Sequence, residues 1–275
     1  MENMNFSDTF RNLEIAEHKV GVIWIGQAGF LLKTAGGRKI LIDPYLTDSV
    51  YHIMEKEEGL GYKRLSVPLF EPNEVIPDFL LISHEHPDHL DMEAMPVYRD
   101  QENLQVITNT GCKEQLVEAG FPENRIHALR KGEEVSCGEF WVKAVDCDHG
   151  ELCPDALGFL LDFGFVKLYY SGDTGYTPER LREAVMERPD VALLPINGAY
   201  GNLNGTQAAR LAADLEVTAC IPHHFWTFPR HLGNPIEAVG AFRELAPRCR
   251  LDMDMPGRVF LYPRGEDPEE RSIHG

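Results

Sequence analysis

The sequence lacks the features that mark nucleic-acid-binding and membrane proteins. No run of five or more basic residues occurs in its 275 positions, and 44 Asp and Glu outnumber 26 Lys and Arg, which gives a formal net charge of −18. Because nucleic acids and anionic membrane surfaces are bound through clustered Lys and Arg, we expect neither as a partner. No apolar stretch approaches the ~18 residues that a membrane-spanning helix needs.

Signatures of secretion and of disulfide-stabilised domains are lacking as well. The first residues are mixed polar, without the basic and apolar regions of a signal peptide. The six cysteines form no C-x-x-C pair, and a chain of this length can bury a core without disulfides, so we expect reduced thiols. We therefore expect a cytoplasmic protein, and self-association into a homo-oligomer is left open.

Short apolar segments separated by turn residues predict a protein built mainly on sheets. Strands are predicted over 20–25, 30–33, 39–42, 79–83, 104–108, 140–145, 157–163, 166–171, 191–196, 218–221 and 258–262. Capping residues and helix-stop signals predict helices over 113–119, 179–187, 207–215 and 236–245. We expect one domain over 1–275, with a core over about 20–263, a lid or insertion at 46–76 and a charged tail at 265–275.

The most informative segment is Ser83-His84-Glu85-His86-Pro87-Asp88-His89, which follows a predicted strand. Four metal-capable side chains stand within six residues, and a strand end followed by a tight turn can bring them into one small volume. Imidazole and carboxylate together suit Zn²⁺, Mn²⁺ or Fe²⁺. The H-x-H-x-D-H spacing therefore predicts a metal site rather than a polar loop with chance histidines.

This segment resembles the signature of the metallo-β-lactamase fold, and the other motifs of that family follow in order. The matching positions are Asp43 at the end of strand 39–42, His149 in 144–150, Asp173 in 171–175, and Pro222-x-His224 followed by an aromatic residue and Thr227-Phe228. The resemblance implies an α/β fold, a four-layer αββα sandwich of two mixed β-sheets packed face to face with helices outside. Through residues 24–30 and the last motif, the chain resembles the L-ascorbate-6-phosphate lactonase group, and it is also similar to N-acylphosphatidylethanolamine phospholipase D.

The resemblance implies a centre for two divalent ions, Zn²⁺ or Mn²⁺, with Fe²⁺ also compatible. His84, His86 and His149 are expected to bind one ion, while Asp88, His89 and His224 bind the other and Asp173 bridges both. Asp88 is also expected to orient the nucleophilic water or accept its proton, so the predicted catalytic residues are Asp88 and Asp173. Asp43 is expected to hold a histidine ligand through a hydrogen bond.

Some of these assignments leave an alternative open. Asp173 lies between glycines and could belong to a simple turn at a strand end, and without His149 the enzyme would work with one metal. His223 and His224 point to opposite sides of an extended chain, so the Pro-x-His spacing favours His224 as ligand and His223 as a supporting residue. Cys147 and Cys153 are excluded from the ligand set. So are the histidines at 18, 52, 127, 231 and 274, which are expected at the surface or in packing.

Substrate contacts are predicted from position along the chain. Gln27 lies in the turn after the first strand, at a position that faces the metals in relatives, and Asn197 and Tyr200 lie on a loop after a strand. Phe225 follows the last ligand and is also expected to contact substrate. Further residues considered are Trp226, which we expect to pack, and Lys63, Arg64 and Arg230, which could bind an anion.

Together these features predict a metal-dependent hydrolase that uses a metal-bound hydroxide to open a lactone or cleave an ester of a small anionic metabolite. The alternative is a phosphodiesterase with the same two-metal site. A redox diiron protein is disfavoured because such relatives carry Glu where His86 stands. A non-catalytic metal protein is disfavoured by the complete ligand set.

Overall fold

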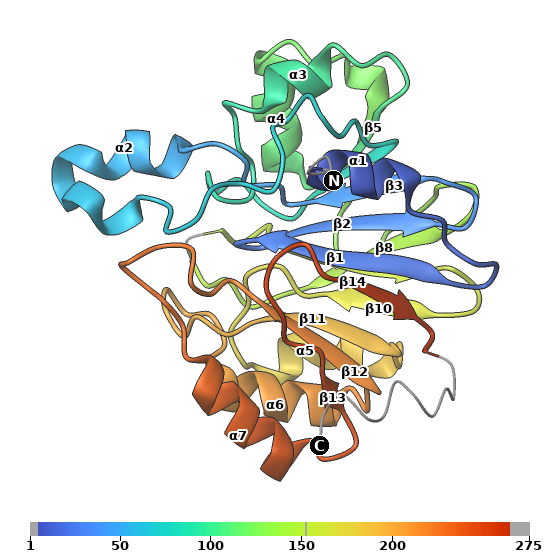
Figure 1. Ribbon diagram of the computed structural model, residues 1–275, viewed down its shortest axis with the longest axis vertical. Helices are drawn as coiled ribbons and strands as arrows, with labels where there is room; N and C mark the ends of the chain where they lie inside the picture. Colours follow the sequence, from blue (N-terminus) through green and yellow to red (C-terminus); the bar gives the residue numbers. More distant parts are fainter. Residues whose placement is uncertain (1–4, 152, 265–275) are drawn as a thin grey trace.

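Two β-sheets of seven strands each pack face to face, and helices cover both outer faces (Figure 1). The computed structural model describes residues 5–151 and 153–264, so the tail predicted at 265–275 lies outside the described residues. The predicted four-layer αββα sandwich is confirmed.

Each sheet joins an antiparallel part to a parallel part. The strand order in the first sheet is β14 (Val259–Tyr262), β1 (Val20–Gly26), β2 (Gly29–Thr34), β3 (Lys39–Ile42), β4 (Phe79–Ile82), β5 (Gln105–Thr108) and β6 (Ile126–Ala128), parallel from β3 onward. The order in the second is β13 (Arg250–Leu251), β12 (Ala219–His223), β11 (Val191–Pro195), β10 (Lys167–Tyr170), β9 (Leu157–Asp162), β8 (Trp141–Asp146) and β7 (Glu134–Ser136), parallel from β13 to β10. The short strands β6, β7 and β13 were missed by the sequence pattern.

Side chains alternate along each strand between the core that separates the two sheets and the face that the helices cover. In β1, Val22 and Trp24 point into the core between the sheets, whereas Ile23 and Ile25 pack under the helices of the first sheet. Side chains of a strand alternate between the two faces of its sheet, and both faces are buried here. This is why the strands read as nearly continuous apolar runs.

Helices form the two outer layers. Those over the first sheet are α1 (Phe6–Asn12), α3 (Met95–Arg99) and α4 (Thr110–Glu118), and those over the second are α5 (Pro178–Met186), α6 (Gly205–Asp214) and α7 (Pro235–Leu245) (Figure 1). Side-chain caps set several starting points: Asn109 accepts from the amide of Cys112, so α4 begins three residues earlier than predicted. None of the described helices combines the length and hydropathy needed to cross a membrane.

The segment 46–76, predicted as a long loop, contains a helix and a 3₁₀ turn. Helix α2 (Ser49–Glu58) continues into η1 (Gly59–Tyr62) and projects beyond the edge of the sheets (Figure 1). The helix was missed because only Ser49 and Val50 of it are buried, which leaves no apolar face to read from the sequence. Buried Asp91 anchors the start of this segment by accepting from both backbone amides of residues 46 and 47.

Glycine permits a close approach where α6 meets α7. A Cβ on Gly205 would lie 2.6 Å from the backbone nitrogen of Ala238, whereas Gly240, exposed on α7, has nothing within 4 Å of its Cβ position. We expect Gly205→Ala to lower the free energy of unfolding by about 1–3 kcal/mol through overpacking, and Gly240→Ala to raise it by about 0.5–1 kcal/mol through helix propensity. Urea denaturation of both variants measures this, and shifts of the same sign would contradict the packing at Gly205.

Candidate metal centre

The predicted ligands follow the carboxyl ends of strands that meet at one edge of the sandwich. Ligands are known to collect at this edge in sheets with parallel strands. Here His84 and the rest of its loop follow β4, His149 follows β8, Asp173 follows β10 and His224 follows β12. The two sheets are joined at this edge by the hydrogen bond from the amide of His224 to the carbonyl of Gln27 (2.8 Å).

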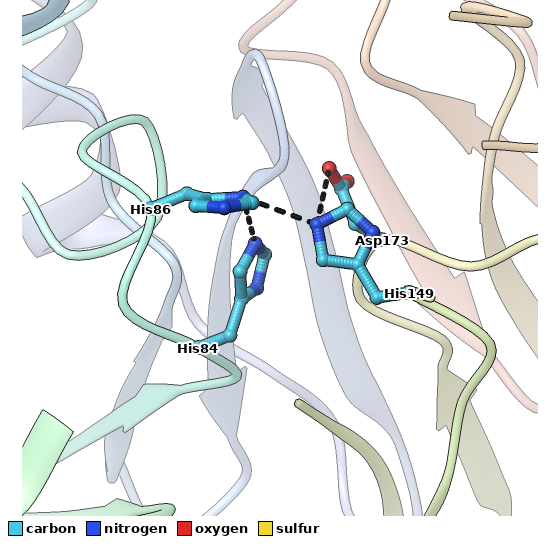
Figure 2. Close-up of side chains that lie close together, drawn as sticks. All are labelled: His84, His86, His149 and Asp173. Carbon is cyan, nitrogen blue, oxygen red and sulfur yellow. Dashed lines mark hydrogen bonds and ion pairs between the residues drawn. The ribbon is translucent and has the colours of Figure 1, made fainter. Parts of the chain in front are cut away.

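Three histidines and one aspartate form the first group (Figure 2). Nδ1 of His86 lies 3.0 Å from Nε2 of His84 and 3.1 Å from Nε2 of His149. Two nitrogens bound to one tetrahedral ion at 2.0–2.1 Å lie about 3.3 Å apart, so this spacing is close to that of a metal site. Oδ2 of Asp173 stands 3.9 Å from Nε2 of His149.

Asp88, His89 and His224 form the second group, and Asp173 reaches both groups. Oδ1 of Asp173 lies 3.3 Å from Nε2 of His89 and 3.3 Å from Nε2 of His224. Oδ2 of Asp88 lies 3.3 Å from the same nitrogen of His224. The structure therefore brings all seven predicted ligands together, with Asp173 placed between the groups.

Asp43 supports the predicted ligands through hydrogen bonds. This fully buried carboxylate accepts from Nδ1 of His89 (2.7 Å), from the Ser83 amide (2.7 Å) and hydroxyl, and from the Tyr170 hydroxyl (2.6 Å). The bond to His89 holds its ring so that Nε2 is directed at the centre. Ser83 also accepts from Nδ1 of His84 (2.9 Å), which leaves Nε2 of that ring for a ligand role. Sequence reasoning missed the roles of Ser83 and Tyr170. Ser83 directly precedes the predicted ligand His84, and Tyr170 stands three residues before the predicted ligand Asp173.

Burial and opposite charges shift the pKa values of these groups in the metal-free protein. Burial opposes protonation of His224, but Asp173 and Asp88 outweigh it and raise its pKa to about 9. The same carboxylates raise the pKa of His89 against its burial. Burial opposes ionisation of Asp88, yet the histidine charges lower the pKa of this carboxyl. His84 differs, because burial and its histidine neighbours lower its pKa.

Unpartnered atoms show that the cluster fits metal ions. Nε2 of His89 and Oδ1 of Asp173 are buried and lack a hydrogen-bond partner among the described residues. Buried polar atoms without partners are costly unless an ion or water completes them. Imidazole nitrogens and carboxylate oxygens are the donors that Zn²⁺, Mn²⁺ and Fe²⁺ accept. Cys147 and Cys153 belong to none of the ligand groups.

The predicted substrate residues differ in their surroundings. Gln27 is buried and donates through Nε2 to Oδ2 of Asp88 (2.8 Å), so it contacts the ligands themselves. Asn197 is nearly buried, and neither amide atom has a partner within the described chain. Tyr200 is 54% exposed beside the centre. The predicted contact of Phe225 with substrate is not supported, because the ring is 3% exposed and stacks on Trp24 at 4.6 Å.

His223 is buried and packs against aromatic rings. Its ring stacks on Tyr170 at 5.4 Å and meets Phe30 edge-on at 5.5 Å, and neither nitrogen has a hydrogen-bond partner among the described residues. It therefore supports the ligand His224 by packing.

The three cations considered for anion binding already have partners. Lys63 pairs with Asp48 (2.5 Å) and Arg230 with Glu58 (3.3 Å). Arg64 donates to the carbonyl of Tyr45 (2.6 Å) and stacks on its ring.

His231 and Tyr62 lie beside the centre, and the sequence analysis did not place them there. The ring of His231 lies 5.7 Å from that of His224 and 5.8 Å from that of Tyr62, and burial lowers its pKa to about 4. His18, His52 and His127 are exposed as expected. No spacing rule singles out His231, because it is brought to the centre by an irregular loop.

We expect Tyr170→Phe to weaken metal binding about 10-fold or more, because it removes a donor that fixes Asp43. The neighbouring Tyr169→Phe is a matched control: its hydroxyl is equally buried but has no partner among the described residues. Competition titration with a chelating dye measures both affinities. Equal affinities in the two variants would show that the hydroxyl of Tyr170 does not support the ligands.

The raised pKa of His224 predicts how the stability of the metal-free protein depends on pH. The folded state binds more protons than the unfolded state, whose histidines titrate near 6.5. The resulting stabilisation is complete below about pH 6.5 and is lost as the pH rises through about 9. The Tm of the metal-free protein should fall by a few degrees between pH 7 and 9, and His224→Gln should flatten this profile. A wild-type Tm that rises over this interval would contradict the assignment.

Comparison with known proteins agrees with this geometry. Residues 21–224 match the family model described as beta-lactamase superfamily domain. The chain is 29% identical over 240 residues to the "UPF0173 metal-dependent hydrolase" of Caldivirga maquilingensis, covering 87% of this chain and 97% of that protein. It is 30% identical over 246 residues to the protein of the same name from Rubrobacter xylanophilus, covering 86% and 94%.

A solved structure shows the same fold. The metallo-beta-lactamase fold protein YhfI of Bacillus subtilis is similar with a TM-score of 0.65 at 15% identity, covering 88% of this chain and 99% of that one. The protein thus belongs to the metallo-β-lactamase superfamily, alongside relatives that are named metal-dependent hydrolases.

Proposed function

We propose that the protein hydrolyses a lactone or a related ester of a small metabolite with two divalent ions, in the manner of the L-ascorbate-6-phosphate lactonase group. The observation that carries this proposal is the position of Asp173. Its two oxygens face different ligand groups, Oδ1 toward His89 and His224 and Oδ2 toward His149. A carboxylate placed in this way can bridge a pair of ions.

His84, His86 and His149 would hold one ion, and Asp88, His89 and His224 the other, with Asp173 shared. Zn²⁺ and Mn²⁺ suit this donor set, and Fe²⁺ is compatible with it. Such ions supply Lewis acidity, which lowers the pKa of water and polarises a carbonyl or phosphoryl oxygen.

The remaining roles fall to side chains of the protein. Some of them hold other side chains in position, and one can accept a proton. The Asp88 side chain is 16% exposed, against 6% for Asp173 and 0% for Asp43, so it is the ligand carboxylate most open to substrate and water. Gln27 donates to Oδ2 of Asp88 and orients this carboxylate. Asp88 is thereby placed to orient a water molecule or accept its proton, while Asp43 keeps His89 in position.

Two substitutions in the ligand groups test the proposal. Asp173→Asn and His86→Ala should each lower metal content below two ions per chain and reduce lactone hydrolysis by at least about 100-fold. His127→Ala serves as control, because this exposed histidine hydrogen-bonds through its ring to Gln105 and belongs to no ligand group among the described residues. Elemental analysis and steady-state kinetics with Zn²⁺ and with Mn²⁺ provide the measurements. Full turnover in either ligand variant, or wild-type protein that holds no metal after loading, would rule out the proposed centre.

The reaction type is decided by a substrate panel. Glucono-δ-lactone and a phenyl ester should be hydrolysed by the wild type at least about tenfold faster, in kcat/KM, than bis(p-nitrophenyl) phosphate. The reverse order would make the protein a phosphodiesterase with the same ligand set.

A further inference from the structure

Three aromatic side chains from separate segments meet beside His224. Tyr62 comes from η1, Tyr200 from the loop after β11, and His231 from the loop after β12. The ring of His231 lies 5.8 Å from Tyr62 and 5.4 Å from Tyr200, and the two tyrosine hydroxyls are hydrogen-bonded to each other. We call these three residues the rim.

Backbone hydrogen bonds join the segments that carry Tyr62 and His231. The amide of Arg230 donates to the carbonyl of Gly61 (2.9 Å), and the amide of Leu65 donates to the carbonyl of Thr227 (2.9 Å). These bonds tie the segment of η1 to the loop that carries His231. Phe228 fills the space beneath, with its ring 5.6 Å from Tyr62 and 5.5 Å from His231. The rings are therefore preorganised, which reduces the entropic cost of binding.

The rim offers polar atoms, and the basic residues next to Tyr62 and His231 in the sequence are ion-paired. Nδ1 of His231 is buried and has no partner among the described residues, and Tyr200 is 54% exposed. Lys63 is paired with Asp48, and Arg230 is paired with Glu58. Arg64 instead lines a separate surface cavity of about 450 Å³, whose lining includes no rim residue and no predicted ligand. With these cations engaged in ion pairs, an uncharged group matches the aromatic faces of the rim better than a phosphate does.

We propose that Tyr62, Tyr200 and His231 form a subsite that binds an uncharged, planar part of the substrate next to His224. The proposal rests on the proposed hydrolase function and names its substrate class: a neutral aryl or otherwise planar lactone or ester. The exposed ring of Tyr200 can take a planar group by stacking, while buried Tyr62 holds the Tyr200 hydroxyl and Nδ1 of His231 can hydrogen-bond a polar edge.

The test compares neutral and charged substrates. Wild-type protein loaded with Zn²⁺ should hydrolyse dihydrocoumarin, a neutral aryl lactone, with a lower KM than glucono-δ-lactone, and should gain nothing from a phosphate on the latter at carbon 6. Tyr200→Ala and His231→Ala should raise KM for dihydrocoumarin about tenfold, by a clearly larger factor than KM for glucono-δ-lactone. Leu232→Ala is the matched control on the same exposed loop.

A second measurement does not depend on turnover. The lactam analogue of dihydrocoumarin, 3,4-dihydro-2-quinolinone, should bind the wild type in calorimetry and lose about tenfold in affinity in Tyr200→Ala and His231→Ala, with the thermal transition of each variant recorded to confirm folding. Absence of lactam binding to the wild type, unchanged affinity in both folded variants, or a more than tenfold preference for the phosphorylated lactone would overturn the subsite. If no lactone or ester is hydrolysed but lactam binding depends on the rim, the proposed function fails and the subsite stands.

Discussion

Two buried carboxylates, Asp43 and Asp173, determine how the rest of this site is built. Taking a carboxylate out of water costs several kcal/mol unless donors or opposite charges replace the solvent. Asp43 meets this requirement with four hydrogen-bond donors from Ser83, His89 and Tyr170. Asp173 lacks such a set, since its Oδ1 has no hydrogen-bond partner among the described residues and faces only histidine nitrogens. Positive charge must balance it, either as protons on His89 and His224 or as metal ions. Protons and metals therefore compete for the same nitrogens, which makes metal affinity depend on pH.

The sandwich supplies the two sides of the centre from different sheets. His84 and His86 follow β4 of the first sheet, whereas His149 and Asp173 follow β8 and β10 of the second. The first ligand group is therefore assembled only when the sheets pack on each other. Any ion that binds these four residues stabilises the packed state over states in which the sheets separate, because it binds the folded chain alone. Metal binding and the stability of the interface between the sheets are therefore thermodynamically linked.

The ligands could be predicted from the sequence because each follows a strand and sits in a short motif with defined spacing. His149 and Asp173 carry weaker local signals than the loop 83–89, and their match to the motif order of the metallo-β-lactamase fold supplied the rest. The strands were predictable because strands buried on both faces leave apolar runs that are easy to read, and the four-layer arrangement came from the resemblance to the metallo-β-lactamase fold. Helix α2 leaves no such run, since it buries only Ser49 and Val50. Tyr170 and His231 could not be assigned from sequence, because their roles depend on which side chains the tertiary structure places against them. Phe225 was misassigned for the same reason, since its position next to a ligand does not reveal that it stacks on Trp24.

Ligands and rim are thus encoded in different parts of the fold. The metal ligands are fixed by strand ends, where a shift of one residue would turn a side chain to the opposite face. The rim residues Tyr62, Tyr200 and His231 lie on connections whose mutual hydrogen bonds, not the sheet ladders, set their positions. Changes in these connections can alter what is bound beside His224 without moving the ligands. Under the proposed assignment, the residues that hold the metals and the residues that select a substrate group therefore belong to separable parts of the fold.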